Sequence, residues 1–265
     1  MNAFDLRERT AVVTGAASGL GRSFARALAS AGASVCCVDK DMEGAEETAA
    51  SIRSSDRRAS AFQVDVASER SVTELVEAVV TSGAGVDILV NNAGIATTPA
   101  RTHQVGIEDW DRLMAVNLRG TFLVTRSVLP IMLRGRRGTI INIASVIGLI
   151  GLYPGFAMSG VPYAASKAAV TGFTRQLAVE YAEEGIRANV IAPGWHGGTK
   201  LGQARRATAT PEIIAQFEKH ILGSVPMGRR GRPEEMDGLV VYLASDASAY
   251  VTGQTFVHDG GLTSA

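Results

Sequence analysis

The chain has 265 residues, of which 46% are apolar and 20% are charged, so it can bury a large core and is too apolar to be disordered. Its 26 basic residues balance its 26 acidic residues, which leaves no net charge to attract nucleic acid or an anionic membrane. The sequence opens without a signal-peptide pattern, and its most apolar stretch, residues 140–153, is too short to span a bilayer. We therefore expect a cytoplasmic protein that binds neither nucleic acid nor a membrane.

The cysteines and histidines show no metal-binding pattern. Cys36 and Cys37 are adjacent in an apolar run, where their side chains would point to opposite faces of a strand and pack in a reducing compartment. The four histidines lack ligand spacing: His103, His196, His220 and His258. We expect no metal site.

Short apolar runs alternate with amphipathic stretches along the chain. Strands are predicted at 10–14, 34–38, 60–64, 86–90, 139–144, 187–191 and 254–257. Helices are predicted near 19–31, 41–54, 68–82, 107–133, 162–184, 210–222 and 233–245. Most strands are rich in Val, Ile or Ala without strict alternation, as is typical of strands covered on both faces. Strand–helix alternation predicts a Rossmann-type α/β fold, with about seven strands in a doubly wound parallel sheet between two layers of helices. No linker or repeat divides the sequence, so residues 1–265 are predicted to form one domain.

The first predicted strand leads directly into a glycine-rich loop, which a predicted helix follows. Glycine lets the backbone turn tightly and approach a pyrophosphate, which the N–H groups and dipole of a helix N-terminus attract. The candidate cofactor-binding residues of this loop are Gly15, Ser18, Gly19, Leu20 and Gly21. A plain strand-to-helix turn is the alternative, since the glycine spacing differs from the common dinucleotide fingerprint.

Acidic residues end the second and third predicted strands. Asp39 is placed where a carboxylate would accept hydrogen bonds from an adenosine ribose. Asp65, followed by Val66, is placed to bind the adenine amine. Each carboxylate also has a plain structural interpretation, as a cap of the helix that follows it.

Small and amide residues follow the fourth predicted strand, at the edge where such sheets bind ligands. Asn91, Ala93 and Gly94 are candidates for contact with a ribose, with a structural turn as the alternative. Asn117 lies within a long helical pattern, where a semi-buried amide needs a partner such as an ordered water or a carbonyl group. Pro130 is expected to kink or end that helix.

Tyr163 and Lys167 are four residues apart in a predicted helix, so both side chains project from one face. A phenol has a pKa near ~10, and acid/base work at neutral pH needs a pKa about 2–3 units lower, which one cation at ~4–5 Å supplies at an effective dielectric of about 20. Ser145 ends the fifth predicted strand, where its hydroxyl can donate to a substrate oxygen. Tyr and Lys at this spacing also occur by chance on helix surfaces, and a serine in such a place is often only part of a turn.

Together these residues resemble the short-chain dehydrogenase/reductase family, and the resemblance covers nearly the whole chain. The matching residues are Thr14-Gly15, Gly19, Gly21, Asp65, Asn91-Asn92-Ala93-Gly94, Asn117, Ser145, Tyr163, Lys167 and Pro193-Gly194. Because they occur in the family's order, the match is highly specific.

The resemblance implies a role for each polar residue. Tyr163 would be the general acid/base, and Ser145 would orient and polarise the substrate oxygen. Lys167 would hold the nicotinamide ribose and lower the pKa of Tyr163. Asn117 would place a water in the proton relay. A phenolate would then take the alcohol proton while hydride leaves the carbon for the nicotinamide.

Two segments depart from the family pattern. The interval between the predicted catalytic serine and tyrosine is longer than usual, which marks residues 153–160 as an insertion beside the active site. Pro193 and Gly194 match the family's cofactor-binding pair, but the threonine that binds the carboxamide stands one place late, at Thr199, which leaves its role open. Residues 195–227 are expected to form a lid over the substrate.

We therefore predict an NAD-dependent enzyme that interconverts a small-molecule secondary alcohol and a ketone. NAD is favoured over NADP because Asp39 would repel a 2′-phosphate, although Lys40 would offset part of that repulsion. Small residues on the helices predicted at 107–133 and 162–184, together with the family resemblance, predict a homotetramer. The alternatives are a non-catalytic NAD-binding sensor or scaffold, and an isomerase or dehydratase that uses the same cofactor pocket.

Overall fold

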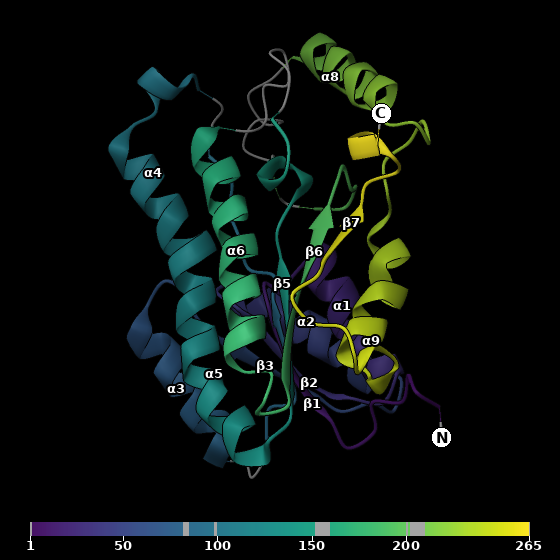
Figure 1. The fold of residues 1–265 in the computed structure, drawn as a ribbon. Coiled ribbons are helices and arrows are strands. Elements are labelled where there is room, and N and C mark those ends of the chain that lie inside the picture. Colours follow the sequence, from purple (N-terminus) through teal and green to yellow (C-terminus); the bar gives the residue numbers. More distant parts are fainter. Residues whose placement is uncertain are drawn as a thin grey trace.

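The computed structural model describes residues 2–81, 85–97, 100–151, 160–199, 201 and 210–264. Within this part of the chain, seven strands form one parallel sheet in the order β3-β2-β1-β4-β5-β6-β7 (Figure 1). The strands are β1 (Thr10–Thr14), β2 (Ser34–Asp39), β3 (Ala59–Gln63), β4 (Ile88–Asn91), β5 (Gly138–Ile143), β6 (Ile186–Pro193) and β7 (Thr255–His258). Each end lies within two residues of its predicted position. The structure therefore confirms the predicted doubly wound parallel sheet.

Helices cover both faces of the sheet (Figure 1). One face carries α1 (Gly19–Ser30), α2 (Met42–Arg53) and α9 (Asp237–Ala244), and the other carries α3 (Glu69–Thr81), α5 (Thr121–Gly135) and α6 (Val161–Glu180). The remaining helical elements are α4 (Ile107–Met114), α8 (Pro211–Ser224), η1 (Thr102–Gln104), η2 (Ala115–Gly120), η3 (Val146–Gly148), η4 (Pro233–Met236), η5 (Asp246–Ser248) and η6 (Leu262–Ser264).

The two cysteines show how the sheet separates two apolar cores. Successive residues of a strand point to opposite faces. Cys36 accordingly packs with α3, α5 and α6, whereas Cys37 packs with α1, α2 and α9. Both thiols are buried and outside any disulfide, and burial raises the pKa of Cys36 to about 11 and that of Cys37 to about 12. They are packing residues that stay protonated at neutral pH.

The single helical pattern predicted over residues 107–133 is three consecutive elements in the structure. A π-helical segment, η2, separates α4 from α5 and carries Asn117. Segments of this kind are frequent at functional sites, because they reorient one turn of a helix. Pro130 does not end the helix, since α5 continues past it to Gly135. The buried side chains of Leu129 and Met132 hold this part of α5 in the core although proline lacks a backbone donor.

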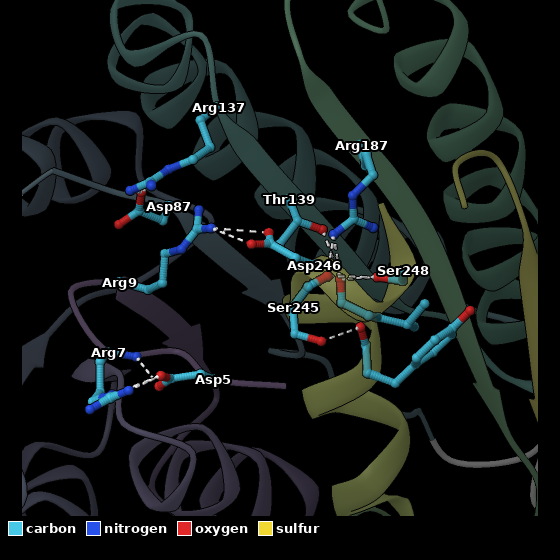
Figure 2. A network of polar contacts seen from close by, with 12 residues as sticks. Asp5, Arg7, Arg9, Asp87, Arg137, Thr139, Arg187, Ser245, Asp246 and Ser248 are labelled. Atoms are coloured by element: carbon cyan, nitrogen blue, oxygen red, sulfur yellow. Dashed lines mark hydrogen bonds and ion pairs between the residues drawn. The ribbon is translucent and has the colours of Figure 1, made fainter. Parts of the chain in front are cut away.

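A network of hydrogen bonds and ion pairs covers the amino ends of the strands (Figure 2). Arg187, at the start of β6, donates to the carbonyl oxygen of Leu243 at 2.9 Å and to that of Ser245 at 3.2 Å. These carbonyls lie at the C-terminal end of α9, where a helix leaves its last acceptors unpaired. Arg9, just before β1, forms an ion pair with Asp246 at 3.0 Å. Structural contacts thus fill this edge, and the carboxyl edge carries the candidate site.

Two predicted segments are only partly described. Most of the insertion at 153–160 and the central part of the lid at 195–227 lie outside the described residues. Among the helices of the described ranges, none is long and apolar enough to cross a membrane. In the same ranges, no three His, Cys, Asp or Glu side chains gather as a metal ion would require.

Candidate active site

The predicted site residues gather at the carboxyl edge of the sheet. The strand order reverses between β1 and β4, and sheets of this type bind ligands outside the strand ends at such a switch point. The glycine-rich loop follows β1, and the loop that contains Gly94 follows β4, so the two loops flank the switch point.

Thr14 and Asn92 tie these two loops together. The Thr14 hydroxyl accepts hydrogen bonds from the N–H groups of Asn92 and Ala93, both at 3.0 Å. In return, the Asn92 amide nitrogen donates to the carbonyl oxygens of Thr14 at 3.0 Å and Gly15 at 3.2 Å. Neither Thr14 nor Asn92 was among the predicted cofactor-binding residues. Their place inside the two motifs was the available signal, but the contact itself joins residues 78 positions apart.

The glycine-rich loop forms a cradle that side chains would fill. A Cβ atom on Gly21 would lie 2.1 Å from the carbonyl oxygen of Gly15, so only glycine fits. Gly19 has a φ of +55°, and a Cβ atom on it would lie 3.3 Å from the Cα atom of Thr199. The two glycines thus let the N-terminus of α1 pack closely against the loop, and the free N–H groups of a helix N-terminus can bind a phosphate. The same contact places Thr199 beside the glycine-rich loop.

Two other residues of the loop have distinct environments. Ser18 precedes α1 with extended backbone angles, and within the described part of the chain its side chain makes no capping hydrogen bond. Its hydroxyl can therefore meet a ligand. The Leu20 side chain packs against the core between the sheet and α1, so only its backbone can face a bound phosphate.

Asp39 fixes the shape of the loop from the end of β2. Its Oδ2 atom accepts from the Ala17 N–H and its Oδ1 atom from the Asp41 N–H, both at 3.0 Å. The cap of α2 is Asp41, whose Oδ1 atom accepts from the Gly44 N–H at 3.1 Å. The helix-cap interpretation of Asp39 is therefore wrong, and its carboxylate lies against the candidate phosphate-binding loop.

Asp65 and Val66 follow β3. Asp65 pairs with Lys40 at 3.2 Å, and its Oδ1 atom accepts from the Ala67 N–H at 3.0 Å. Val66 is buried, and a Cβ atom on Gly120 would lie 2.9 Å from its Cγ2 atom. Val66 thus packs closely against the π-helical segment.

Asn91 belongs to a buried polar ladder behind the loop. Its amide nitrogen donates to Thr125 Oγ1 at 2.9 Å and to Asn142 Oδ1 at 2.8 Å, and Asn142 donates in turn to Thr174 Oγ1 at 2.8 Å. The ladder joins β4 and β5 to α5 and α6. Both donors of the Asn91 amide are used, so the structure gives this side chain a scaffolding position.

Tyr163, Lys167 and Ser145 come together where α6 crosses the end of β5. The Tyr163 and Ser145 hydroxyl groups lie close enough to interact, and the buried Ser145 hydroxyl donates to the Pro193 carbonyl oxygen at 3.5 Å. The Lys167 ammonium group lies 5.7 Å from the centroid of the Tyr163 ring and donates to the Ile143 carbonyl oxygen at 2.8 Å. Lys167 is only 5% exposed, so this carbonyl bond is what satisfies the buried charge. The structure therefore brings together the three residues predicted to act on the substrate.

Burial dominates the protonation of this trio in the ligand-free protein. It raises the pKa of Tyr163 to about 12, while the hydrogen bond with Ser145 acts in the opposite direction. It lowers the pKa of Lys167 to about 8. The expected lowering of the Tyr163 pKa by Lys167 is therefore not found without ligand, because desolvation of the phenolate outweighs any attraction from the ammonium group.

Asn117 and Gly94 lie on the other side of Lys167. The Asn117 side chain accepts from the Ile95 N–H at 2.8 Å and donates to the Ile95 carbonyl oxygen at 3.0 Å and to Ser166 Oγ at 3.2 Å. A Cβ atom on Gly94 would lie 3.4 Å from Asn117 Oδ1 and 3.5 Å from Lys167 Nζ. Asn117 thus holds the loop after β4 against α6.

Pro193 ends β6, and Gly194 follows it next to an apolar cluster. The Gly194 N–H donates to the His258 carbonyl oxygen at 3.0 Å, and a Cβ atom on Gly194 would lie 2.6 Å from that of Asp259. The next residue, Trp195, is buried in an apolar cluster. The other members are Ile147, Ile221, Val225 and Leu262. The described parts of the predicted lid therefore pack beside Ser145 and the C-terminal segment.

Comparisons with known proteins agree with this geometry. The sequence profile of the family described as "Enoyl-(Acyl carrier protein) reductase" matches residues 15–263. The chain is similar to 3beta-hydroxysteroid dehydrogenase 1 of Eggerthella lenta, at 42% identity over 261 residues that cover 98% of this chain and 95% of the relative. It is also 40% identical over 240 residues to the inactive 2-(S)-hydroxypropyl-CoM dehydrogenase 2 of Xanthobacter autotrophicus, which covers 90% of this chain and 99% of the relative. The crystal structure of a gluconate 5-dehydrogenase from Burkholderia cenocepacia J2315, in complex with NADP and tartrate, matches with a TM-score of 0.90 at 37% identity, covering 100% of this chain and 98% of that one.

The chain belongs to the short-chain dehydrogenase/reductase family, as its motifs indicated. It is an oxidoreductase of that family, whose members bind a nicotinamide cofactor.

Proposed function

We propose that the protein is an NAD-dependent oxidoreductase that interconverts a secondary alcohol and a ketone. The observation that supports this most directly is that the Ser145 and Tyr163 hydroxyl groups lie together, with the Lys167 ammonium group beside the tyrosine ring. An alcohol oxygen placed between the two hydroxyl groups would meet a hydrogen-bond donor and a proton acceptor together.

Each residue of the site has a defined role in this proposal. Tyr163 takes the hydroxyl proton when the alcohol is oxidised and returns it when the ketone is reduced. Ser145 donates a hydrogen bond that orients and polarises the substrate oxygen. Lys167 holds the cofactor ribose and stabilises the phenolate form of Tyr163. Asn117 fixes the groups around Lys167 through which a water would relay the proton. A bound nicotinamide accepts or supplies the hydride.

The proposed cofactor contacts follow the carboxyl edge of the sheet. Gly15, Ser18, Gly19, Leu20 and Gly21 would face the pyrophosphate. The adenosine half would meet Asp39, Asp65 and Val66. Asn91 would contribute only its backbone, because its side chain belongs to the buried ladder. The proposed set is completed by Ala93, Gly94, Pro193, Gly194 and Thr199. The close packing of Gly21 against the Gly15 carbonyl group supports this path, because it brings the N-terminus of α1 directly against the turn after β1.

Asp39 is the reason to propose NAD rather than NADP. Its two carboxylate oxygens are held in place by backbone N–H groups, so the charge cannot turn away from a bound adenosine ribose. Lys40, the cation nearest in sequence, pairs with Asp65 instead. The gluconate 5-dehydrogenase was crystallised with NADP, so this preference has to be measured for the present chain.

The proposed substrate is an uncharged and partly apolar alcohol. The apolar cluster of Ile147, Trp195 and Leu262 lies next to Ser145, because the Ile147 N–H donates to the Ser145 hydroxyl. The name of the Eggerthella lenta relative points to a compact, ring-shaped apolar alcohol of the same kind. A sugar acid such as gluconate would need a cationic partner for its carboxylate.

A substrate panel tests this proposal. Hydroxysteroids, cyclic secondary alcohols, an aromatic secondary alcohol and gluconate would each be supplied with NAD and with NADP, and reduced nicotinamide would be followed by absorbance. We expect turnover of the neutral cyclic alcohols with NAD. Turnover of gluconate alone would overturn the proposed substrate class, and no redox activity toward any alcohol or matching ketone would overturn the function.

The inactive Xanthobacter relative favours one rival, a non-catalytic NAD-binding sensor or scaffold. Such a protein would bind NAD without turnover. The present chain retains Tyr163, the proposed acid/base group. An isomerase or dehydratase is the other rival, and it would convert a substrate without net accumulation of reduced nicotinamide. The same panel, analysed for products as well as absorbance, separates all three functions.

Replacing Lys167 by Met is expected to weaken NAD binding and to slow turnover. It should also move the rising limb of the pH–kcat profile for alcohol oxidation to higher pH. Loss of the cation raises the pKa of the phenol in the cofactor complex, and the phenolate is the proton acceptor. Lys167→Arg keeps the charge and should move the profile less. An unchanged profile in a folded, active Lys167→Met variant would contradict the electrostatic role.

A homotetramer is the proposed assembly, with the outer faces of α4, α5 and α6 at an interface. Val179 on α6 is 79% exposed and Ile107 on α4 is 70% exposed, which leaves apolar surface for a partner copy. Light scattering at micromolar concentration is expected to report a tetramer. Val179→Lys should shift the protein toward smaller species, whereas Val80→Lys on α3 should not. A wild-type monomer would remove the proposal.

A further inference from the structure

Two histidines that the proposed mechanism does not use lie in contact at the carboxyl edge of the sheet. His196 follows β6 and His258 ends β7, 62 residues later. The Nε2 atom of His196 is 3.1 Å from the Nδ1 atom of His258, a hydrogen-bond distance. His196 is only 8% exposed, so water cannot readily take the place of these contacts.

The outer nitrogen atoms of both rings face carbonyl groups. His196 Nδ1 is 3.3 Å from the Gly194 carbonyl oxygen, and His258 Nε2 is 3.1 Å from the Glu235 carbonyl oxygen. A carbonyl oxygen only accepts, so each outer nitrogen must carry a hydrogen to form its bond. The contact between the rings needs a third hydrogen. Two neutral imidazoles carry only two.

The backbone prevents His196 from turning away from this arrangement. A Cβ atom on Gly231 would lie 2.5 Å from His196 Nε2, so the glycine backbone lies directly against the ring. The Gly231 N–H donates to the Trp195 carbonyl oxygen, and the Gly197 N–H donates to the Gly231 carbonyl oxygen, both at 2.9 Å. These hydrogen bonds fix the backbone of the residues before and after His196, so the fold sets the orientation of its ring.

We propose that His196 and His258 form a proton-dependent positioning pair, which takes up one shared proton and then grips the Gly194 carbonyl group. With three protons all three hydrogen bonds form. With two protons one contact must lose its hydrogen, and the longest, to Gly194, is the one that is lost. The proposal rests on the proposed function only where it assigns Gly194 to the cofactor site.

The charges around the pair set the pH at which this happens. Burial and the neighbouring His258 lower the pKa of His196, whereas the Gly194 carbonyl group, Glu235 and Asp259 act to raise it. Glu235, on η4, is also paired with Arg229 at 2.7 Å and with Arg232 at 3.5 Å. Since burial is the largest of these effects, the pKa of His196 lies below the ordinary histidine value of ~6.5. A second additional proton would place two cations 3.1 Å apart and is not expected.

Protonation of the histidine pair should change how firmly Gly194 is held in the turn that leads into the predicted lid. Gly194 also receives its position from β7, through the bond from its N–H to the His258 carbonyl oxygen. When the shared proton is present, Gly194 is held at both its N–H and its carbonyl group. Lower pH should therefore order this turn and favour cofactor binding, and higher pH should loosen it.

Nitrogen-15 NMR of the imidazole rings in the ligand-free protein tests the proton count directly. Only four histidines are present, so single replacements of His103 and His220 help to assign the signals. We expect two protonated ring nitrogens in the pair at pH 8 and three near pH 5. Two at both pH values, or four at the lower one, would overturn the proposal.

His258→Asn and His258→Gln then test the positioning role. The Asn amide reaches the place of Nδ1 and can donate to His196 at every pH, whereas the Gln amide reaches the place of Nε2 and leaves His196 without its partner. The NAD dissociation constant of the wild type should rise about two- to tenfold from pH 5.5 to pH 8, the effect of one hydrogen bond. In His258→Asn the NAD dissociation constant should change less between pH 5.5 and pH 8 than in the wild type. In His258→Gln binding of NAD should stay weak at high pH. An equal pH dependence in the wild type and His258→Asn would overturn the positioning role. Failure to bind NAD at any pH would instead refute the proposed function and leave the proton count standing.

Discussion

Tyr163→Phe is expected to lower kcat by about 10²–10⁴-fold, the usual contribution of a general acid/base, and to leave the NAD dissociation constant nearly unchanged. The replacement removes one ionisable oxygen and keeps the aromatic ring in its place beside Lys167. Ser145 loses its contact with the phenol but stays anchored, since its hydroxyl donates to the Pro193 carbonyl oxygen at 3.5 Å and accepts from the Ile147 N–H at 3.3 Å. Turnover would be measured by nicotinamide absorbance with the best alcohol of the panel, and NAD binding by calorimetry.

Tyr181→Phe is the matched control for this experiment. Tyr181 follows the last turn of α6 and packs in the core between α3, α5 and α6, far along the helix from Tyr163. Removing its hydroxyl should leave kcat unchanged. If Tyr163→Phe kept the wild-type kcat with an active substrate, the assignment of the acid/base would be wrong, and the phenol would be only a packing group.

The second large effect is expected for the choice of cofactor: kcat/KM should be higher with NAD than with NADP by about two orders of magnitude or more. A carboxylate accepts from both ribose hydroxyls, and charge-assisted hydrogen bonds of this kind contribute roughly 1.5–3 kcal/mol. A 2′-phosphate in the same place would lose them and meet like charge at ~4–5 Å, which costs about 3–4 kcal/mol per unit charge at an effective dielectric of about 20. Lys40 would offset part of this cost, because its ion pair with Asp65 is exposed and weak.

Two replacements of Asp39 separate its charge from its structural contacts. Asp39→Asn removes the charge and keeps an oxygen that can accept from the Ala17 N–H, so the NAD preference should narrow while the protein stays folded. Asp39→Ala also releases the loop and should weaken binding of both cofactors. A wild-type preference for NADP would contradict the assignment of Asp39 as the residue that selects NAD. Retention of the full NAD preference in Asp39→Asn would show that another group selects the cofactor.

Most of the fold could be predicted because its signals are local. Apolar runs without alternation identified every strand of the sheet, since a strand covered on both faces needs apolar side chains on both. The spacing of Tyr163 and Lys167 predicted their common position, because residues four apart on a helix share a face whatever surrounds them. The family motifs supported the same fold, because they occur along the chain in the order that the family shows.

The mistaken expectations concerned quantities that depend on packing. The pattern at 107–133 hid the π-helical segment, because the same apolar spacing is compatible with one helix or with two joined by a wider turn. The pKa of Tyr163 was expected to fall beside a cation, but burial of the phenol has the larger effect in the ligand-free protein. Sequence spacing measures neither burial nor the exact length of a turn.

By itself, the sequence determined the strands and helices, the parallel sheet and the residues available for catalysis at its carboxyl edge. Only the tertiary structure decided which of those residues meet. The bonds of Thr14 with Asn92, the ladder through Asn91 and the contact between His196 and His258 all join segments on different strands. Which residues meet depends on the strand order and on how far each strand extends. A hydrogen bond also requires the distance between donor and acceptor atoms to be right within a few tenths of an ångström. Local propensity carries no such information, because it acts over a few neighbouring residues, whereas these contacts form only after the whole sheet has assembled.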